Sequence, residues 1–217
     1  ASQACIQKIL LAEFPEHGFL AEENASIEAP DGQHRWIVDP LDGTMNYVHG
    51  VPQFAVSIAL ERAGEIIAGV VYDPCLNECF TAELGGGAAL NGQPIQCSNV
   101  QSLLQALVVA SFPAGIRAGH PEIERFIRVL VASQSLRRTG SAAINLCYIA
   151  AGRFDGYWAT STKIWDVAAG FLILREAGGV VSNLDGGEVD LNIPKFVAAS
   201  SPALNEQLRQ TLDGTSA

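Results

Sequence analysis

Basic side chains are scarce in this sequence of 217 residues, which has 13 Lys and Arg against 23 Asp and Glu and a formal net charge of −10. The few basic residues are scattered along the chain, so the sequence predicts no nucleic-acid partner. Its acidity instead favours a cation. Charged residues make up 17% of the chain, below the roughly 25% of an average soluble domain. Much of the chain is therefore expected to be buried.

Long apolar runs, repeats and low-complexity linkers are also missing. Without about eighteen consecutive apolar residues we expect no transmembrane helix and no membrane partner, and we find no signal-peptide pattern, so we predict a cytoplasmic protein. We predict a single unit over residues 1–217. Its two halves, 1–95 and 96–217, are expected to meet near Pro94 to Gln105.

The cysteines are odd in number and mostly lie in apolar segments, which favours buried free thiols in a reducing compartment over disulfides. They are Cys5, Cys75, Cys79, Cys97 and Cys147. The pair Cys75 and Cys79 resembles half of a zinc site, but no second pair follows, and His34 and His49 lie on unrelated segments. Zinc is not predicted.

The first half reads as one helix followed by an antiparallel meander. Helical spacing over Ser2 to Phe14 puts Ile6, Ile9, Leu10 and Phe14 on one side, and Pro15 ends the helix. Strands are predicted at Trp36 to Asp39, Ala55 to Arg62, Ile66 to Tyr72 and Glu78 to Ala82. The three glycines at 85–87 precede no predicted helix, so we do not assign them to a phosphate.

In the second half, helices alternate with short strands. The helices are predicted at Pro121 to Ser133, Ser141 to Ala151, Asp166 to Ala177 and Pro202 to Leu212, and the strands at Ala106 to Ala110, Gly156 to Ala159, Val180 to Ser182 and Phe196 to Ala199. This alternation predicts an α+β fold in which helices and sheets form layers.

The letters LDGT occur twice, at 41–44 and at 212–215. Only the first copy follows an apolar strand, which places Asp39 at the strand end and Asp42 three residues later. The second copy lies in a polar tail, where Gly214 is the expected stop signal of a fraying helix. Chemistry is therefore expected at the first copy alone.

Two buried carboxylates at a strand end are costly unless they share a positive charge. No Lys or Arg lies between Arg35 and Arg62 to supply it. A divalent ion is the simplest answer, and oxygen ligands of this kind suit Mg²⁺, Mn²⁺ or Ca²⁺. The next two residues fit a phosphate reaction, since Gly43 exposes its N–H to an anion and the Thr44 hydroxyl can orient a water.

Two further acids are candidates for the same site. Glu22 follows an apolar pair, and its alternative reading is a solvated surface acid. Asp166 opens a predicted helix of small residues, and its alternative reading is an N-cap.

Read together, these segments resemble the inositol monophosphatase family of Mg²⁺-dependent, Li⁺-sensitive phosphatases. The matching stretches are AEEN at 21–24, WIVDPLDGTMNYVHGVPQFAVSIAL at 36–60, GSAAINLCYIAAGRFDGYW at 140–158 and WDVAAGFLILREAGG at 165–179. The resemblance implies that family's layered α-β-α-β-α sandwich. It also implies an additional N-terminal segment, with an Asp supporting the Thr, that would precede Ala1, so we expect the chain to be truncated there.

By position, the resemblance implies a first Mg²⁺ on Glu22, Asp39 and the Leu41 carbonyl, and a second on Asp39, Asp42 and Asp166. A third, looser ion would involve Glu22. Mn²⁺ could substitute, while Ca²⁺ and Li⁺ would inhibit. The phosphate would meet the N–H groups of Gly43 and Thr44. The catalytic residues implied are Glu22, Thr44 and Asp42, and the substrate-facing ones are Asp42, Gly140, Ser141, Ala142 and Asp166.

The leading hypothesis is a phosphomonoesterase for inositol 1-phosphate that uses metal-activated water and no covalent intermediate. Ala159 stands where many members carry a sugar-binding acid, which keeps histidinol phosphate, a nucleotide 3′-phosphate or a sugar phosphate open. Lys163 could meet a second anionic group. An aspartyl-nucleophile phosphatase does not fit, because Asp39 and Asp42 are separated by two residues instead of one. A metal- or phospholigand-binding protein is the non-enzyme alternative, and a homodimer is expected.

Overall fold

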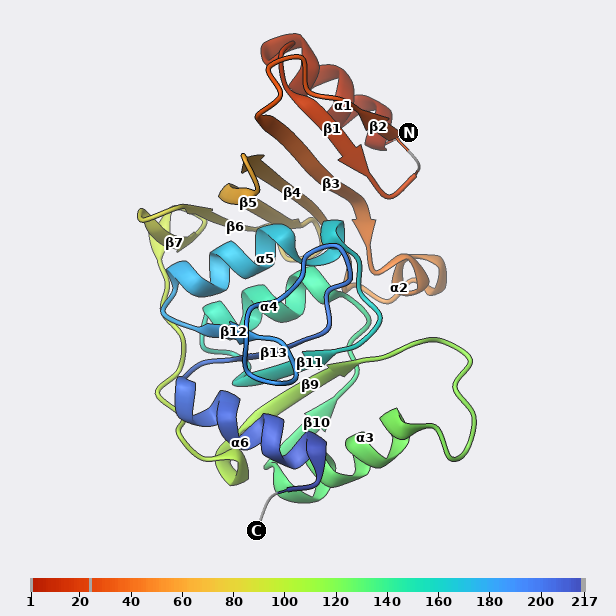
Figure 1. Ribbon diagram of the computed structural model, residues 1–217, viewed down its shortest axis with the longest axis vertical. Coiled ribbons are helices and arrows are strands. Elements are labelled where there is room, and N and C mark those ends of the chain that lie inside the picture. Colours follow the sequence, from red (N-terminus) through yellow and green to blue (C-terminus); the bar gives the residue numbers. More distant parts are fainter. Residues whose placement is uncertain (1, 24, 216–217) are drawn as a thin grey trace.

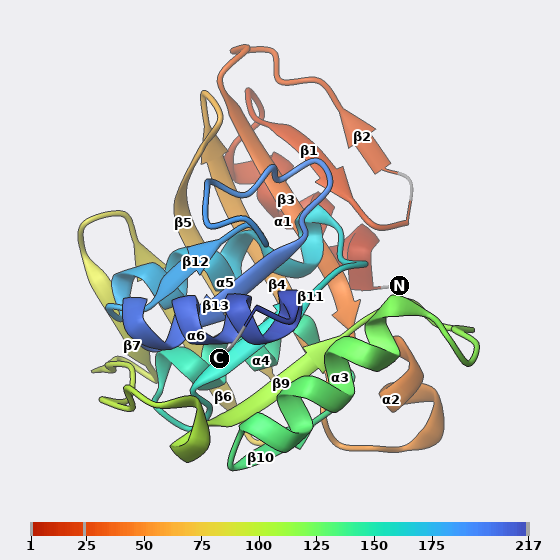
Figure 2. The same ribbon diagram turned by 60° about the horizontal axis from the view of Figure 1, so that its bottom comes forward.

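The computed structural model describes residues 2–23 and 25–215, and within them helices and sheets alternate in five layers (Figure 1). Helix α1 (Ser2–Glu13) covers the outer face of a large sheet, and α4 (Ala142–Ala150) and α5 (Ile164–Glu176) lie between that sheet and a smaller one. Helices α3 (Pro121–Ala132) and α6 (Pro202–Asp213) cover the far side, where Figure 2 shows them side by side. The predicted α-β-α-β-α sandwich is confirmed.

The large sheet has the order β2-β1-β3-β4-β5-β6-β7-β8. From β3 onward neighbouring strands are antiparallel, as the meander predicts, but β1 and β3 are parallel, with Ala21 opposite Val38. The carboxyl ends of β1 and β3 therefore lie together. The strands are β1 Gly18–Ala21, β2 Ala25–Ile27, β3 His34–Asp42, β4 Ala55–Arg62, β5 Glu65–Asp73, β6 Glu78–Glu83, β7 Gly87–Leu90 and β8 Gln93–Pro94.

The smaller sheet has the order β10-β9-β11-β13-β12, with β9 parallel to both of its neighbours. Its strands are β9 Leu107–Ser111, β10 Ser135–Arg137, β11 Gly156–Ala159, β12 Val180–Ser182 and β13 Phe196–Ala199. A 3₁₀ turn, Leu103–Gln105, leads into it, and a short helix, α2 (Thr44–His49), follows β3 in the first half. The sequence did not predict α2.

The main hydrophobic cluster joins the two halves of the chain. It includes Ile37 and Val71 from the large sheet, Tyr157 and Phe196 from the small one, and almost every side chain of α4 and α5. Because α4 and α5 lie between two sheets, they are apolar on all sides. The division of the chain into the halves 1–95 and 96–217 stays a prediction.

Three local expectations need correction. On α1, Ile9 is 58% exposed, and Phe14, which directly follows the helix, is 44% exposed, while Leu11 packs against the sheet in their place. The cysteines are free, but Cys5 and Cys75 are exposed.

The second LDGT copy ends α6, with Gly214 in the left-handed conformation that stops the helix (φ 80°), as predicted. However, Leu212 is buried, so this helix end is packed and does not fray. Among the described residues, no helix is both long and apolar enough to cross a membrane.

Candidate active site

The end of β3 brings two acidic side chains into the interior. Asp39 is 2% and Asp42 7% exposed. The strand does not stop at Asp39, as the sequence suggested, but continues to Asp42 through a bulge. Pro40 lies inside that bulge, where it has no N–H to pair. The Leu41 N–H donates to Asp39 Oδ1 at 2.9 Å, which fixes the orientation of this carboxylate.

Asp42 ties the first half of the chain to the N-terminus of α4. Its carboxylate accepts hydrogen bonds from the Ser141 hydroxyl, from the Ala142 N–H at 3.2 Å and from the Ala143 N–H at 2.9 Å. A carboxylate offers about four lone pairs, so roughly one remains for a further ligand. The helix N-terminus also favours the negative charge of Asp42.

Asp166 and Glu22 reach the same region from other elements. Asp166 is the third residue of α5 and not its N-cap, and its Oδ2 accepts the N–H of Lys163 at 2.8 Å. The preceding residue is held to the sheet by Ser57, which donates to the Trp165 carbonyl at 3.3 Å and pairs with Asp39 across β3 and β4. Glu22 is exposed directly after β1, where its N–H meets the Val38 carbonyl.

The charges of these acids act on one another. Burial raises the pKa of Asp39 strongly, and the negative charges of Asp42, Glu22 and Asp166 raise it further. Burial also raises the pKa of Asp42 to about 6, against the lowering effect of its hydrogen bonds. The pKa of Asp166 rises to about 7, mainly by burial, with Asp42 and Glu22 adding to the rise. The four carboxyl groups thus lie close enough in a partly desolvated region that the negative charge of one disfavours ionisation of another.

No basic side chain relieves this crowding. Across residues 2–23 and 25–215, Lys and Arg make no ion pair with Glu22, Asp39, Asp42 or Asp166. The described residues contain one group of three ligating side chains whose donor atoms all lie within 4.8 Å of one another, and these acids do not form it. A hard divalent cation would supply the missing charge.

The turn after Asp42 carries the two residues predicted to meet a phosphate. Gly43 has φ 87°, and a Cβ there would lie 2.9 Å from the Gln53 carbonyl oxygen, so only glycine fits. Thr44 begins α2, is exposed, and donates its hydroxyl to the Leu41 carbonyl at 3.0 Å. That carbonyl keeps a second lone pair for an ion.

The predicted substrate-facing stretch lies against the same turn through a residue that sequence reasoning did not single out. Asn46 on α2 donates to the Gln53 carbonyl at 2.7 Å and to the Thr139 carbonyl at 2.8 Å. It also fills the space beside Gly140, where a Cβ would lie 2.7 Å from the Asn46 amide. No local pattern marks Asn46, because its partners are 7 and 93 residues away.

Two other residues named from the sequence have clear positions. Ala159, where the resemblance led us to expect a sugar-binding acid, is fully buried in the main hydrophobic cluster. Lys163 is exposed. A cavity of about 760 Å³ lies elsewhere, along β5 to β7 and the end of α5, and none of the candidate site residues lines it. The site is therefore assigned from the carboxylates and not from this cavity.

Ser141→Ala should weaken both the fold and ion binding. Its hydroxyl caps α4 by accepting from the Ile144 N–H at 3.2 Å and also donates to Asp42. We expect a loss of about 2–3 kcal/mol in the free energy of unfolding, from a cap worth ~1 kcal/mol and a bond to a charged group. Because that bond lowers the pKa of Asp42, its loss leaves more Asp42 protonated at pH 7 and should weaken Mg²⁺ binding, measured by calorimetry.

Ser201→Ala is the matched control, since Ser201 caps α6 with the same 3.2 Å bond, to the Leu204 N–H, and touches no candidate site residue. It should lose the ~1 kcal/mol of a helix cap and the hydrogen bond from its hydroxyl to the Val100 carbonyl, worth about 1 kcal/mol, with unchanged Mg²⁺ affinity. Equal effects of the two substitutions on Mg²⁺ affinity would contradict the role given to Ser141.

The layered fold and the group of carboxylates at the end of β3 define an α+β protein whose acidic side chains have the chemistry that hard divalent cations prefer. A profile of the Inositol monophosphatase family matches residues 1–216. The chain belongs to this family, whose members are metal-dependent phosphatases that generally use Mg²⁺, and is thereby a phosphoric monoester hydrolase.

Individual relatives agree with this assignment. The chain is 48% identical over 187 residues to an inositol-1-monophosphatase of Mesorhizobium japonicum, covering 86% of this chain and 70% of the relative. It is 40% identical to the Nus factor SuhB of Pasteurella multocida, covering 97% of this chain and 79% of that protein. The crystal structure of the suppressor protein suhB from Bartonella henselae superimposes with a TM-score of 0.93 at 41% identity, over 97% of this chain and 81% of that one.

Proposed function

We propose that the protein hydrolyses a small phosphorylated alcohol, with inositol 1-phosphate as the leading substrate, at the carboxylates where β1, β3 and α5 meet. The observation that carries this proposal is the crowding of Asp39, Asp42, Asp166 and Glu22 without a basic partner in the described chain. Such a group is unfavourable by itself and becomes favourable when it binds cations. Relatives named inositol-1-monophosphatase support the choice of substrate.

The donor set fits two or three Mg²⁺ ions. Glu22, Asp39 and the Leu41 carbonyl would hold one, and Asp39, Asp42 and Asp166 another. When bound, the ions neutralise phosphate charge and lower the pKa of water, which removes the need for a covalent intermediate.

The protein's own groups would then position the reactants. The N–H groups of Gly43 and Thr44 would donate hydrogen bonds to the phosphate from the turn after Asp42. The Thr44 hydroxyl and the Glu22 carboxylate are placed to orient water. Gly140, Ser141 and Ala142 face the alcohol beside Asp42, the residue that fixes their position.

The alternatives within the family differ in the alcohol. A panel of myo-inositol 1-phosphate, histidinol phosphate, a nucleotide 3′-phosphate and a sugar phosphate, assayed for phosphate release with the full-length protein, discriminates among them. We expect Mg²⁺-dependent release that is fastest with inositol 1-phosphate. Faster phosphate release from another compound of the panel would make that compound the assigned substrate. Mg²⁺ binding without release from any of them would favour the metal- or phospholigand-binding alternative.

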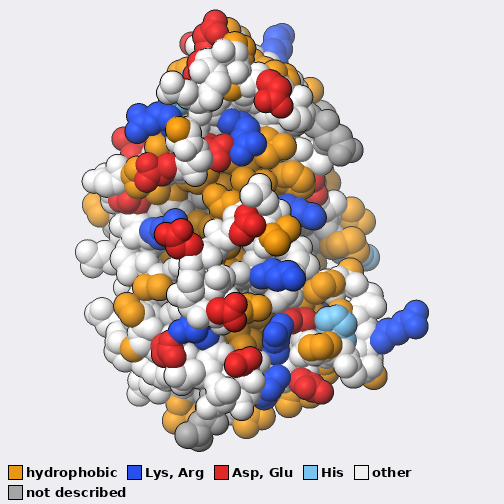
Figure 3. Space-filling model, viewed as in Figure 1, with side chains coloured by type: hydrophobic (Ala, Val, Ile, Leu, Met, Phe, Trp, Pro, Cys, Tyr) orange, Lys and Arg blue, Asp and Glu red, His pale blue; other side chains and the backbone are white. Residues whose placement is uncertain are grey.

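Three further expectations belong to this proposal. Mn²⁺ should support turnover, while Ca²⁺ and Li⁺ should inhibit it. We expect a homodimer, which light scattering on the eluting protein would detect. We also keep the expectation of no nucleic-acid partner, although several relatives carry the name Nus factor SuhB. It rests on the net charge of −10 and on a face where acidic and basic side chains are interspersed (Figure 3). RNA retention in a gel-shift assay at physiological salt would overturn it.

A further inference from the structure

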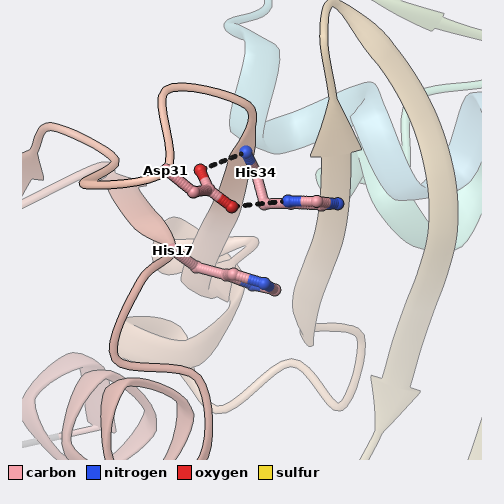
Figure 4. A group of neighbouring side chains, drawn as sticks. All are labelled: His17, Asp31 and His34. Atoms are coloured by element: carbon pink, nitrogen blue, oxygen red, sulfur yellow. Dashed lines mark hydrogen bonds and ion pairs between the residues drawn. The ribbon is translucent and has the colours of Figure 1, made fainter.

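Three ligating side chains gather at the opposite end of the strands that carry the carboxylates. His17 directly precedes β1, His34 is the first residue of β3, and Asp31 lies in the loop before it (Figure 4). Each offers one donor atom, and the three atoms all lie within 4.8 Å of one another. Their loops are joined by a backbone bond from the Asp31 N–H to the Glu16 carbonyl.

We propose that His17, Asp31 and His34 form a second metal site, for a borderline ion such as Zn²⁺, in which the two imidazoles ligate and Asp31 orients His34 and balances the charge. Imidazole nitrogen suits Zn²⁺ and related ions and does not suit Mg²⁺. The imidazole site and the carboxylate site therefore prefer different ions. This proposal does not depend on the reaction proposed above.

The contact between Asp31 and His34 has the form seen around metal-binding histidines. Asp31 Oδ2 lies 2.6 Å from His34 Nδ1, and Oδ1 accepts the N–H groups of Gln33 and His34. An ionised carboxylate can only accept in these bonds. His34 Nδ1 must then carry the hydrogen, which leaves the Nε2 lone pair for an ion, and such a carboxylate bond is the usual support of a ligating imidazole.

His17 is suited to be the second ligand because one of its ring nitrogens has no other role. Nδ1 of His17 is buried and has no hydrogen-bond partner among the described residues. Phe14 and Trp36 contact its ring, and Phe14 stacks on it at 5.0 Å between ring centroids.

Ion binding requires a small local movement. The two imidazole rings are stacked at 4.7 Å with 15° between their planes, and an imidazole binds an ion in its own plane. One ring must therefore turn. His34 is held by Asp31, so His17 is the one that turns. Ligand atoms on a tetrahedral Zn²⁺ lie about 3.4 Å apart, a separation that a turn of His17 can reach from ring centroids now 4.7 Å apart.

Solvent can reach the cluster to complete the coordination. His34 lines a hollow of about 250 Å³ together with Gly32 and Arg35. Arg35 is paired with Glu61 at 2.7 Å, so its charge is compensated. The five residue-to-residue steps from His17 to Glu22 span about 16 Å along β1. The ion would thus bind at the N-terminal ends of β1 and β3, far from the carboxylates at their C-terminal ends.

The test uses the full-length protein, stripped of metal and then saturated with Mg²⁺ so that the carboxylates are occupied. Zn²⁺ binding is titrated by calorimetry. The ligand atoms around the bound Zn²⁺ are identified by X-ray absorption spectroscopy, which detects imidazole ligands directly. We expect two imidazoles per bound Zn²⁺, and at least about tenfold weaker binding in His17→Gln and in His34→Gln. Amide exchange over residues 14–34 should slow when Zn²⁺ binds.

His49→Gln is the matched control, because His49 lies at the end of α2 and belongs to no such cluster. It should bind Zn²⁺ like the unaltered protein. Oxygen-only surroundings for Zn²⁺, or equal affinities in all three histidine variants, would overturn the proposal. The absorption measurement needs no variant, so it decides the matter even where a substitution prevents folding.

Discussion

Asp39→Asn should abolish Mg²⁺-dependent phosphate release, with a fall in kcat/KM of at least about 10³-fold. The side chain stands at the centre of the carboxylate group, and removing its charge deprives both proposed ions of a shared ligand. Metal ions contribute several kcal/mol to the stabilisation of a phosphoryl transition state. A loss of about 4 kcal/mol corresponds to roughly 10³-fold. Steady-state phosphate release with and without Mg²⁺ measures the effect.

Asp73→Asn is a close control for this substitution. Asp73 is also a buried acid at the end of a strand, and its Oδ1 accepts the Cys75 N–H two residues on, as Asp39 accepts that of Leu41. It lies outside the carboxylate group, so its variant should keep its activity. If both variants retained Mg²⁺-dependent release, Asp39 would not be a metal ligand.

Gly43→Ala should lose activity by displacing the turn that we propose to meet the phosphate. Its φ of 87° disfavours any side chain, and the new Cβ would lie 2.9 Å from the Gln53 carbonyl and 3.2 Å from Phe54 Cα, both backbone atoms. Relief of this overlap must move the Gly43 and Thr44 N–H groups. A displacement of about 1 Å at a reacting centre costs on the order of 10²-fold in rate, and left-handed strain adds about 1–3 kcal/mol of destabilisation.

Gly50→Ala, at the other end of α2, separates the effect of left-handed backbone strain from the effect of the overlap with Gln53 and Phe54. Gly50 has φ 71°, yet a Cβ there would meet nothing within 4 Å. It should show the cost of the left-handed backbone alone, with kcat/KM nearly unchanged. Urea unfolding and phosphate release, measured on both variants, give the comparison. A Gly43→Ala enzyme as active as Gly50→Ala would remove the turn from the phosphate site.

The layered fold could be predicted because helices alternate with short strands in the second half of the chain and the strands follow turn residues. Asp39, Asp42, Gly43 and Thr44 could be found for a related reason, since an apolar strand that ends in two acids, with no basic residue nearby in the sequence, indicates a bound cation. Their roles remain proposals.

What could not be predicted depends on contacts between distant segments. The parallel pairing of β1 with β3 places Glu22 beside Asp39 and His17 beside His34, and nothing local to these residues announces it. Nor does any pattern show that Asp42 binds the N-terminus of α4, 100 residues later. The exposure of Ile9 and Phe14 was missed because helical spacing identifies a stripe but not which of its edges is covered.

The most direct test of the carboxylate site is the free energy of unfolding as a function of pH, with Mg²⁺ and with chelator, for the unaltered protein and Asp39→Asn. Burial raises the pKa values of Asp39, Asp42 and Asp166 in the folded state, so the folded chain holds protons that the unfolded chain releases. In chelator, stability should be greatest near pH 4 and fall as pH rises through about 6 to 7, where Asp42 and Asp166 ionise. Mg²⁺ should reverse this fall, and in chelator at pH 8 Asp39→Asn should be the more stable protein. Two results at pH 8 would contradict the account. Mg²⁺ could leave the free energy of unfolding of the unaltered protein unchanged, or it could raise that free energy no more than it does for Asp39→Asn.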